Sequence, residues 1–190
     1  RDQPFVQSLP TQGTFNIATF QVGANTNVTI SARTPAGVQA TATLTVVALN
    51  IQVTVNPNSV VGGIENGLGN IAISAPAPGG GTVVNLTSSM PSAAAVPAST
   101  TIPAGQTSRN FVITTSQVNV DRSVSITARL ATGRSATTTM TVKALTIALN
   151  LNPNNVDGGP GFSTGLITLG SPAPSGGMNV TLSTNNAAAN

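Results

Sequence analysis

The chain lacks four residue types that carry much of the chemistry of enzymes. None of its 190 residues is cysteine, histidine, tryptophan or tyrosine. Without cysteine there are no disulfides and no thiolate metal site. Without histidine, the commonest general base and metal ligand at neutral pH is missing. We therefore expect a protein that is not an enzyme and that has no catalytic, cofactor-binding or metal-binding residues.

Charge is also scarce. Charged residues make up 6% of the chain, against roughly 25% in a typical soluble domain. The net charge is only +3, and the seven basic residues are scattered along the sequence, whereas a nucleic-acid surface needs clustered lysine and arginine. No apolar run approaches the roughly 20 residues of a membrane-spanning helix. We expect no nucleic-acid partner and no membrane span.

The residues that are present favour β-strands. Hydrophobic residues make up 39% of the chain, and many are β-branched, which suits a pleated sheet. Apolar and polar residues alternate with a period of two, as in Ser123–Leu130, where Val124, Ile126, Ala128 and Leu130 are expected to face a core. Such alternation is typical of antiparallel strands with one buried face. No segment has a helical apolar period.

A long internal repeat organises the sequence. At a spacing of 96 residues, Phe15–Met90 aligns without gaps with Phe111–Asn186, with 15 identities in the first 32 positions and 18 in the other 44. The turn-forming Asn56-Pro57-Asn58 has its counterpart in Asn152-Pro153-Asn154. One period contains seven expected strands: Leu49–Val55, Gly69–Ala75, Thr82–Ser88, Ala94–Pro97 extending through Ser99–Ile102, Asn110–Thr115, Ser123–Leu130 and Arg134–Lys143. Seven short strands in about 96 residues predict an all-β, two-sheet antiparallel sandwich.

Three turn segments carry a resemblance to a known family. They are Pro76–Gly80 (Pro-Ala-Pro-Gly-Gly), Val96–Ser99 (Val-Pro-Ala-Ser) and Ile102–Gly105 (Ile-Pro-Ala-Gly). With the strands around them, they resemble the bacterial immunoglobulin-like (fibronectin III-like) tandem repeats of large secreted or cell-surface proteins. The resemblance covers nearly the whole chain. It implies an extracellular or cell-surface stalk, spacer or filament, and it implies no catalytic residues.

The phase of the repeat predicts one complete immunoglobulin-like sandwich and two half domains. Residues 49–144 form the complete repeat, residues 1–48 its C-terminal half, and residues 145–190 its N-terminal half. Two periods are 192 residues (2 × 96), and the chain has 190, so copies placed head to tail would continue the repeat. Either the chain is a window on a longer covalent array, or the two halves of neighbouring subunits complete each other in a filament. Phe5–Pro10 is expected to be strand-like but departs from the repeat.

Acidic residues and possible crosslinks offer little chemistry. The four acidic residues, Asp2, Glu65, Asp121 and Asp157, are isolated in sequence, whereas hydrolysis of glycosides needs a converging pair. Asp157 with Asn154 and Asn155 is a modest calcium candidate, but we interpret all these residues as turn residues. A Lys143 crosslink of the isopeptide type is not expected, because Lys143 should point outward beside Val142. Asn27, Asn85 and Asn179 begin glycosylation sequons, which we interpret as polar strand positions.

The leading functional hypothesis is structural, namely repeats that build a stalk or filament by self-association head to tail. The alternative is an adhesin or carbohydrate-binding surface module. Sugar-binding sandwiches commonly expose aromatic rings, and within the aligned region only Phe20 and Phe162 are aromatics with polar counterparts, Ser116 and Asn66. Glycan binding thus remains an alternative, and packing between adjacent repeats would explain the two rings equally well.

Overall fold

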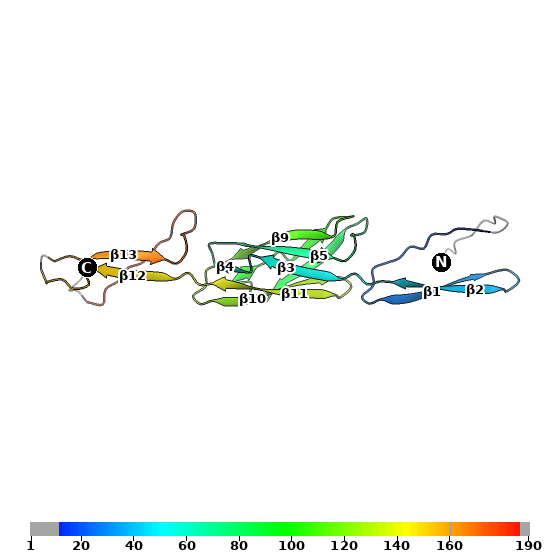
Figure 1. Cartoon of the computed structure of the whole chain (residues 1–190), viewed down its shortest axis with the longest axis horizontal. Helices are drawn as coiled ribbons and strands as arrows, with labels where there is room; N and C mark the ends of the chain where they lie inside the picture. Colours follow the sequence, from blue (N-terminus) through cyan, green and yellow to red (C-terminus); the bar gives the residue numbers. More distant parts are fainter. Residues whose placement is uncertain (1–11, 160, 187–190) are drawn as a thin grey trace. The chain divides into compact units, whose positions relative to one another are not determined.

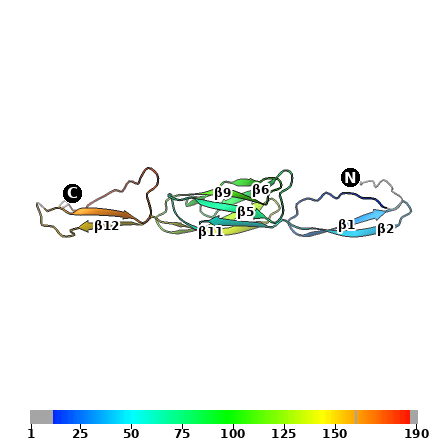
Figure 2. The same cartoon turned by 45° about the horizontal axis from the view of Figure 1, so that its top comes forward.

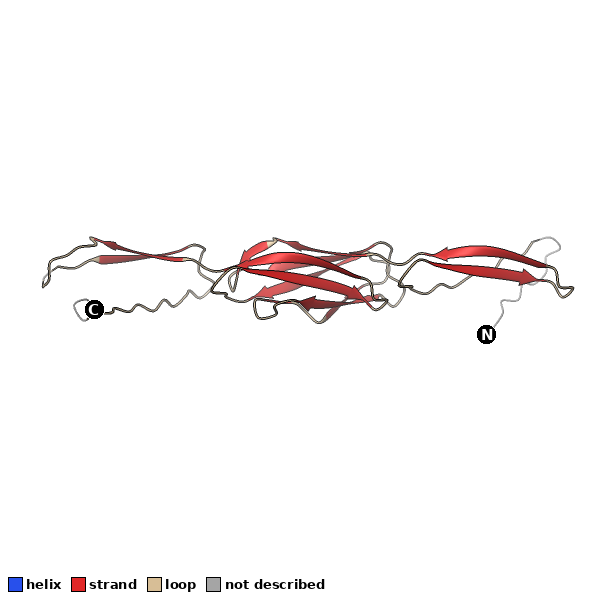
Figure 3. Ribbon diagram, turned by 90° about the horizontal axis from the view of Figure 1, so that it is seen from below, coloured by secondary structure: helices blue, strands red, loops and turns tan. Residues whose placement is uncertain are grey.

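The computed structural model describes residues 12–159 and 161–186. Within these residues the chain is all-β, with strands β1 to β13. Figure 3 shows strands joined by loops and no helix. The described part of the chain therefore contains no long apolar helix of the kind that crosses a membrane. The chain divides into two compact units, Arg1–Leu49 and Asn50–Asn190. The predicted strand Phe5–Pro10 and the acidic Asp2 lie outside the described residues.

The larger unit contains a β-sandwich with two sheets (Figure 1 and Figure 2). One sheet has the strand order β3-β5-β9-β7, formed by β3 (Ile51–Asn56), β5 (Gly67–Ile73), β9 (Ser108–Thr115) and β7 (Ala94–Ala95). The other has the order β4-β11-β10-β6-β8, formed by β4 (Ser59–Val61), β11 (Ser135–Lys143), β10 (Arg122–Leu130), β6 (Thr82–Ser88) and β8 (Ser99–Ile102). The sheets meet where β3 packs against β10 and β11.

The sandwich has nine strands where seven were predicted. The segment Ala94–Ile102, expected as one strand, is split between β7, which pairs with β9, and β8, which pairs with β6. Pro97 lies between the two and has no N–H to donate to a ladder, which explains the break. The other addition is β4, which pairs with β11 in parallel, so the sandwich is not purely antiparallel. Three residues are too short a segment to show a period of two.

The predicted core of the sandwich is confirmed. Val124, Ile126, Ala128 and Leu130 of β10 are all at most 1% exposed. The opposite sheet contributes Ile51, Val53, Ile71, Ile73, Phe111 and Ile113, all buried. The core is thus mostly aliphatic, with Phe111 and Met140 among its other side chains, and strands such as β3 and β6 alternate buried and exposed residues.

The smaller unit contains one hairpin, β1 (Thr26–Arg33) with β2 (Gln39–Val46). Its register repeats that of β10 and β11 at a spacing of 96, because Thr26 pairs with Val46 just as Arg122 pairs with Val142. Residues 12–19 correspond to β9, yet they form no strand. The neighbours of β9 in the sandwich are β5 and β7, and residues 12–48 contain no counterpart of either.

The larger unit also contains a second hairpin, β12 (Ile147–Asn152) with β13 (Thr164–Leu169). It repeats β3 and β5, because Ile147 pairs with Leu169 just as Ile51 pairs with Ile73. Residues 178–184 correspond to β6, and they form no strand either. In the sandwich, β6 takes its hydrogen bonds from β10 and β8. A strand conformation at residues 178–184 therefore lacks the ladder that would stabilise it.

Candidate functional site

The described acidic residues lie in turns and loops, and two of them accept hydrogen bonds from backbone amides. The carboxylate of Asp121 accepts a bond of 2.8 Å from the backbone N–H of Ala144. Glu65 accepts one of 3.3 Å from the N–H of Val61. Within residues 12–159 and 161–186, no three histidine, cysteine or acidic residues gather closely enough to hold a metal ion. Glu65 therefore stabilises its own turn, whereas Asp121 links the start of β10 to the residue that follows β11.

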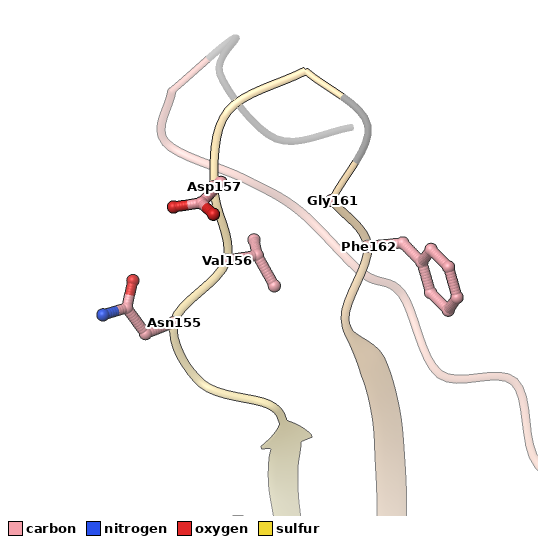
Figure 4. A pocket seen from close by; sticks show the side chains of 5 residues that line it. All are labelled: Asn155, Val156, Asp157, Gly161 and Phe162. Carbon is pink, nitrogen blue, oxygen red and sulfur yellow. The ribbon is translucent and has the colours of Figure 1, made fainter.

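The calcium candidate lies on the loop between β12 and β13. Asn155, Val156, Asp157, Gly161 and Phe162 line an open hollow there, and all five are exposed. Figure 4 shows the Asn155 and Asp157 side chains directed to one side of the loop and the Phe162 ring directed away on the other. Calcium takes six to eight oxygen ligands, several of them usually carboxylates. One exposed carboxylate does not make such a site.

Lys143 and the three sequon asparagines are ordinary exposed positions. Lys143 is exposed at the end of β11 beside the fully buried Val142, as its place in the alternation predicts. Asn27 lies on β1 and accepts a bond of 2.8 Å from the Thr45 hydroxyl. Asn85 on β6 and Asn179 are exposed as well.

The main feature of the smaller unit is an apolar face that no sheet formed by its described residues covers. We call it the first face, and its side chains are Phe15, Ile17, Val28, Ile30, Leu44 and Val46. Their counterparts in the sandwich, Phe111, Ile113, Val124, Ile126, Met140 and Val142, are all buried. Phe15, for example, is 48% exposed and Phe111 only 5%. Much of this face borders an apolar hollow of about 190 Å³.

The second hairpin has a matching apolar face. We call it the second face, and its side chains are Ile147, Leu149, Leu151, Ile167 and Leu169. Leu149 is 56% exposed, whereas its counterpart Val53 is 7% exposed. In the sandwich, the counterparts of the two faces pack against each other, since β3 contacts both β10 and β11. The first face and the second face therefore have the residue patterns of two surfaces that pack together in the sandwich.

Phe20 and Phe162 are the most exposed large apolar side chains described, at 85% and 82%. Their sandwich counterparts, Ser116 and Asn66, are polar and exposed. Phe20 lies at the end of the first face and lines the same hollow as Ile17 and Val28. Phe162 lies two residues before the start of β13.

Alternation identified the residues of both faces, and their exposure followed from the phase of the repeat, which leaves half a sandwich at each end. Ile147, Leu149 and Leu151 alternate just as Ile51, Val53 and Val55 do, and alternation reports which residues share a face, not what covers it. The spacing of 96 carries this information, because it aligns each half domain with only some of the strands of the sandwich.

Comparison with known proteins assigns no family. No protein-family model and no curated protein matches the chain. The two apolar faces, rather than a likeness to a known protein, carry the functional proposal.

Proposed function

We propose that this chain is a structural, extracellular or cell-surface protein whose tandem immunoglobulin-like repeats form a stalk or filament. Each half domain is completed by the complementary half of a neighbouring repeat or subunit, joined head to tail. The observation that carries the proposal is the pair of hairpins β1–β2 and β12–β13. They keep the registers of β10–β11 and β3–β5. The apolar residues that are buried in the sandwich have counterparts in the hairpins that are exposed or only half-buried.

The strand order supports an immunoglobulin-like assignment. An immunoglobulin sandwich of the constant type has strands A, B, E and D in one sheet and C, F and G in the other. Taking β3 as A, β5 as B, β6 as C, β7 as D, β9 as E, β10 as F and β11 as G reproduces both orders. The remaining strands, β4 and β8, are additions at the two edges of the second sheet. On this assignment the domains are residues 49–144, flanked by the halves 1–48 and 145–190.

Physical chemistry favours completion of the half domains. An apolar sheet face in water is unfavourable, and contiguous exposed apolar patches mark interaction sites. An unpaired strand edge adds unsatisfied backbone groups that a further strand can pair with. The low charge of the chain, 6% of residues, limits repulsion between adjacent copies. Apolar burial, strand-edge pairing and weak charge repulsion thus all favour association at the two faces.

A structural role also accords with what the chain offers for chemistry. It has no histidine or cysteine, and the acidic residues Glu65 and Asp121 accept hydrogen bonds from backbone N–H groups. The location at the cell surface and the bacterial setting follow from the resemblance of Pro76–Gly80, Val96–Ser99 and Ile102–Gly105 to bacterial surface repeats. On this proposal the protein is not an enzyme.

The alternative function is that of an adhesin or carbohydrate-binding module. The observation in its favour is the exposure of the Phe20 and Phe162 rings, because sugars stack on exposed aromatics. Specific binding on a glycan array that Phe20→Ala abolishes would favour this alternative over the structural role.

Sedimentation of the purified chain tests the structural proposal. We expect reversible, concentration-dependent association into a series of species larger than the 18.8 kDa chain. A single monomeric species across the micromolar to millimolar range would contradict it. The mass of the denatured natural protein then separates subunits of about this size from a long covalent array.

A further inference from the structure

Resting on the proposed function, a more specific inference concerns the partner of the first face. We propose that the first face is covered by the second face of a second copy of this chain, in the register that places Phe15 opposite Gly165. Residues 12–19 of one copy pair with β13 of the other, and Phe20 meets Phe162 at the edge of the completed domain.

The sandwich provides the precedent for the occupant. There, β9 pairs with β5, with Phe111 directly opposite Gly69. A Cβ on Gly69 would overlap the Phe111 ring, so the glycine makes room for the aromatic side chain. At a spacing of 96, Phe111 corresponds to Phe15 and Gly69 to Gly165. The half-exposed Phe15 ring and the open Gly165 thus lie outside the sandwich, on opposite halves of the chain.

The strand edges are complementary as well. In the sandwich, β5 has neighbours on both sides, β3 and β9. Its counterpart β13 pairs only with β12, so within the described residues its other edge has no strand partner. Likewise β10 lies between β11 and β6, whereas its counterpart β1 has β2 as its only partner among the strands that the structure describes. Residues 12–19 match the open edge of β13, and residues 178–184 match the open edge of β1.

A second copy can supply both missing pairings at once. The segment that covers the first face in the precedent is β3 to β6, and residues 145–186 repeat its sequence pattern. Val84 and Leu86 of this segment are both buried in the sandwich. Their counterparts Val180 and Leu182 are exposed. The contact is heterologous, because different surfaces of the two copies meet, and such contacts propagate instead of closing as a symmetric dimer.

Phe20 and Phe162 distinguish this contact from the interior of the sandwich. In the sandwich, the backbone N–H of Thr115 donates a bond of 3.1 Å to the side-chain oxygen of Asn66. The same pairing between copies brings Thr19, the counterpart of Thr115, beside Phe162, the counterpart of Asn66. Phe20 is the next residue along. The polar contact of the sandwich is replaced by a pair of rings that are otherwise exposed to water.

A disulfide placed in this register tests the proposal in the full chain, which has no native cysteine. The chosen pair is Thr14→Cys with Leu166→Cys. Their counterparts, Asn110 and Asn70, pair directly, and the side-chain nitrogen of Asn70 lies 2.6 Å from the side-chain oxygen of Asn110. The matched control is Asn16→Cys with Thr168→Cys, which lies four residues out of register. Four residues correspond to roughly 13 Å along a strand, beyond the reach of a disulfide.

We expect mild oxidation of the in-register double variant to give covalent dimers, trimers and larger species that reduction reverses. The single variants should give dimers at most, and the control pair should stay largely uncrosslinked. A disulfide confined to one chain, or equal crosslinking of the control pair, would overturn the inference. If the cysteine-free chain associates but the in-register pair does not crosslink, the register is wrong and the proposed function stands. If the cysteine-free chain does not associate, both fail.

The aromatic contact has its own measurement. Phe20→Ala and Phe162→Ala should each weaken self-association. An aromatic pair is worth roughly 0.5–1.5 kcal/mol beyond its buried area. The double variant should therefore raise the dissociation constant by about two- to tenfold less than the product of the two single increases. Strictly multiplicative effects would show that the two rings do not meet.

Discussion

The glycine at position 165 offers the sharpest perturbation of the contact between copies. Within the chain, a Cβ on Gly165 would meet only Leu151 at 3.4 Å and Leu149 at 3.8 Å, both side-chain carbons at or near ordinary van der Waals distance. Since glycine weakens a strand relative to alanine by roughly 0.5–1 kcal/mol, Gly165→Ala should leave the isolated hairpin unharmed or slightly more stable. The substitution should weaken only the association between copies.

The magnitude follows from the counterpart in the sandwich. A Cβ on Gly69 would overlap the Phe111 ring, and inserting a methyl group into a packed core costs about 1–3 kcal/mol. Gly69→Ala should therefore lower the free energy of unfolding of the sandwich by that amount. If Phe15 of a second copy lies over Gly165, Gly165→Ala should instead weaken self-association about 5- to 150-fold.

Sedimentation equilibrium measures the dissociation constant, and urea unfolding measures stability. The control is Gly79→Ala in a turn of the sandwich, where a Cβ would meet nothing within 4 Å, and where the counterpart is already Ser175. It should change neither quantity. An unchanged dissociation constant for Gly165→Ala would refute the reasoning, and a loss of stability in the monomeric chain would show that the effect is local.

Three further predictions use matched positions. Ile126→Ala should lower the free energy of unfolding of the sandwich by about 2–5 kcal/mol in a urea titration, because Ile126 is fully buried. Ile30→Ala at the half-buried counterpart should weaken association in sedimentation but lower the free energy of unfolding of the dilute chain by less. An equal loss of stability at both sites would argue against an incomplete first domain. Leu149→Ser on the exposed second face should reduce association without changing the urea midpoint of the sandwich, and a lowered midpoint would mean that this face is already buried in the single chain. Asp121→Ala removes the acceptor for the backbone N–H of Ala144 and should destabilise the sandwich by about 0.5–1.5 kcal/mol, whereas Asp157→Ala, on the exposed loop, should leave the urea midpoint unchanged.

Much of the sandwich could be predicted from sequence because its strands alternate. The residues expected to face the core on β10, from Val124 to Leu130, are all buried, and the turns fall at the Asn-Pro and Gly-Gly positions. Two local features escaped prediction. Pro97 separates β7 from β8, and the short β4 pairs with β11 in parallel; both depend on long-range partners that a local pattern does not specify.

The outer segments show the limit of reading strands from local pattern. Residues 12–19 have nearly the alternation of β9, with Phe15, Ile17 and Thr19 identical to Phe111, Ile113 and Thr115, yet they form no strand. A strand needs a neighbour for its backbone hydrogen bonds, and here the sequence that could pair lies on the other half of the chain. The exposure of Phe20 and Phe162 was suggested by their polar counterparts and is confirmed. Their role stays a prediction.

The most direct test of the central claim is amide hydrogen exchange along residues 12–19. These residues have no strand partner within the described chain, whereas their counterparts in β9 pair with β5 and β7. Exchange should be fast in dilute solution and should slow in the assembled protein toward the rates of β9, with matching protection appearing in β13. Fast exchange of residues 12–19 in the assembled protein would contradict the claim that a complementary half completes this domain.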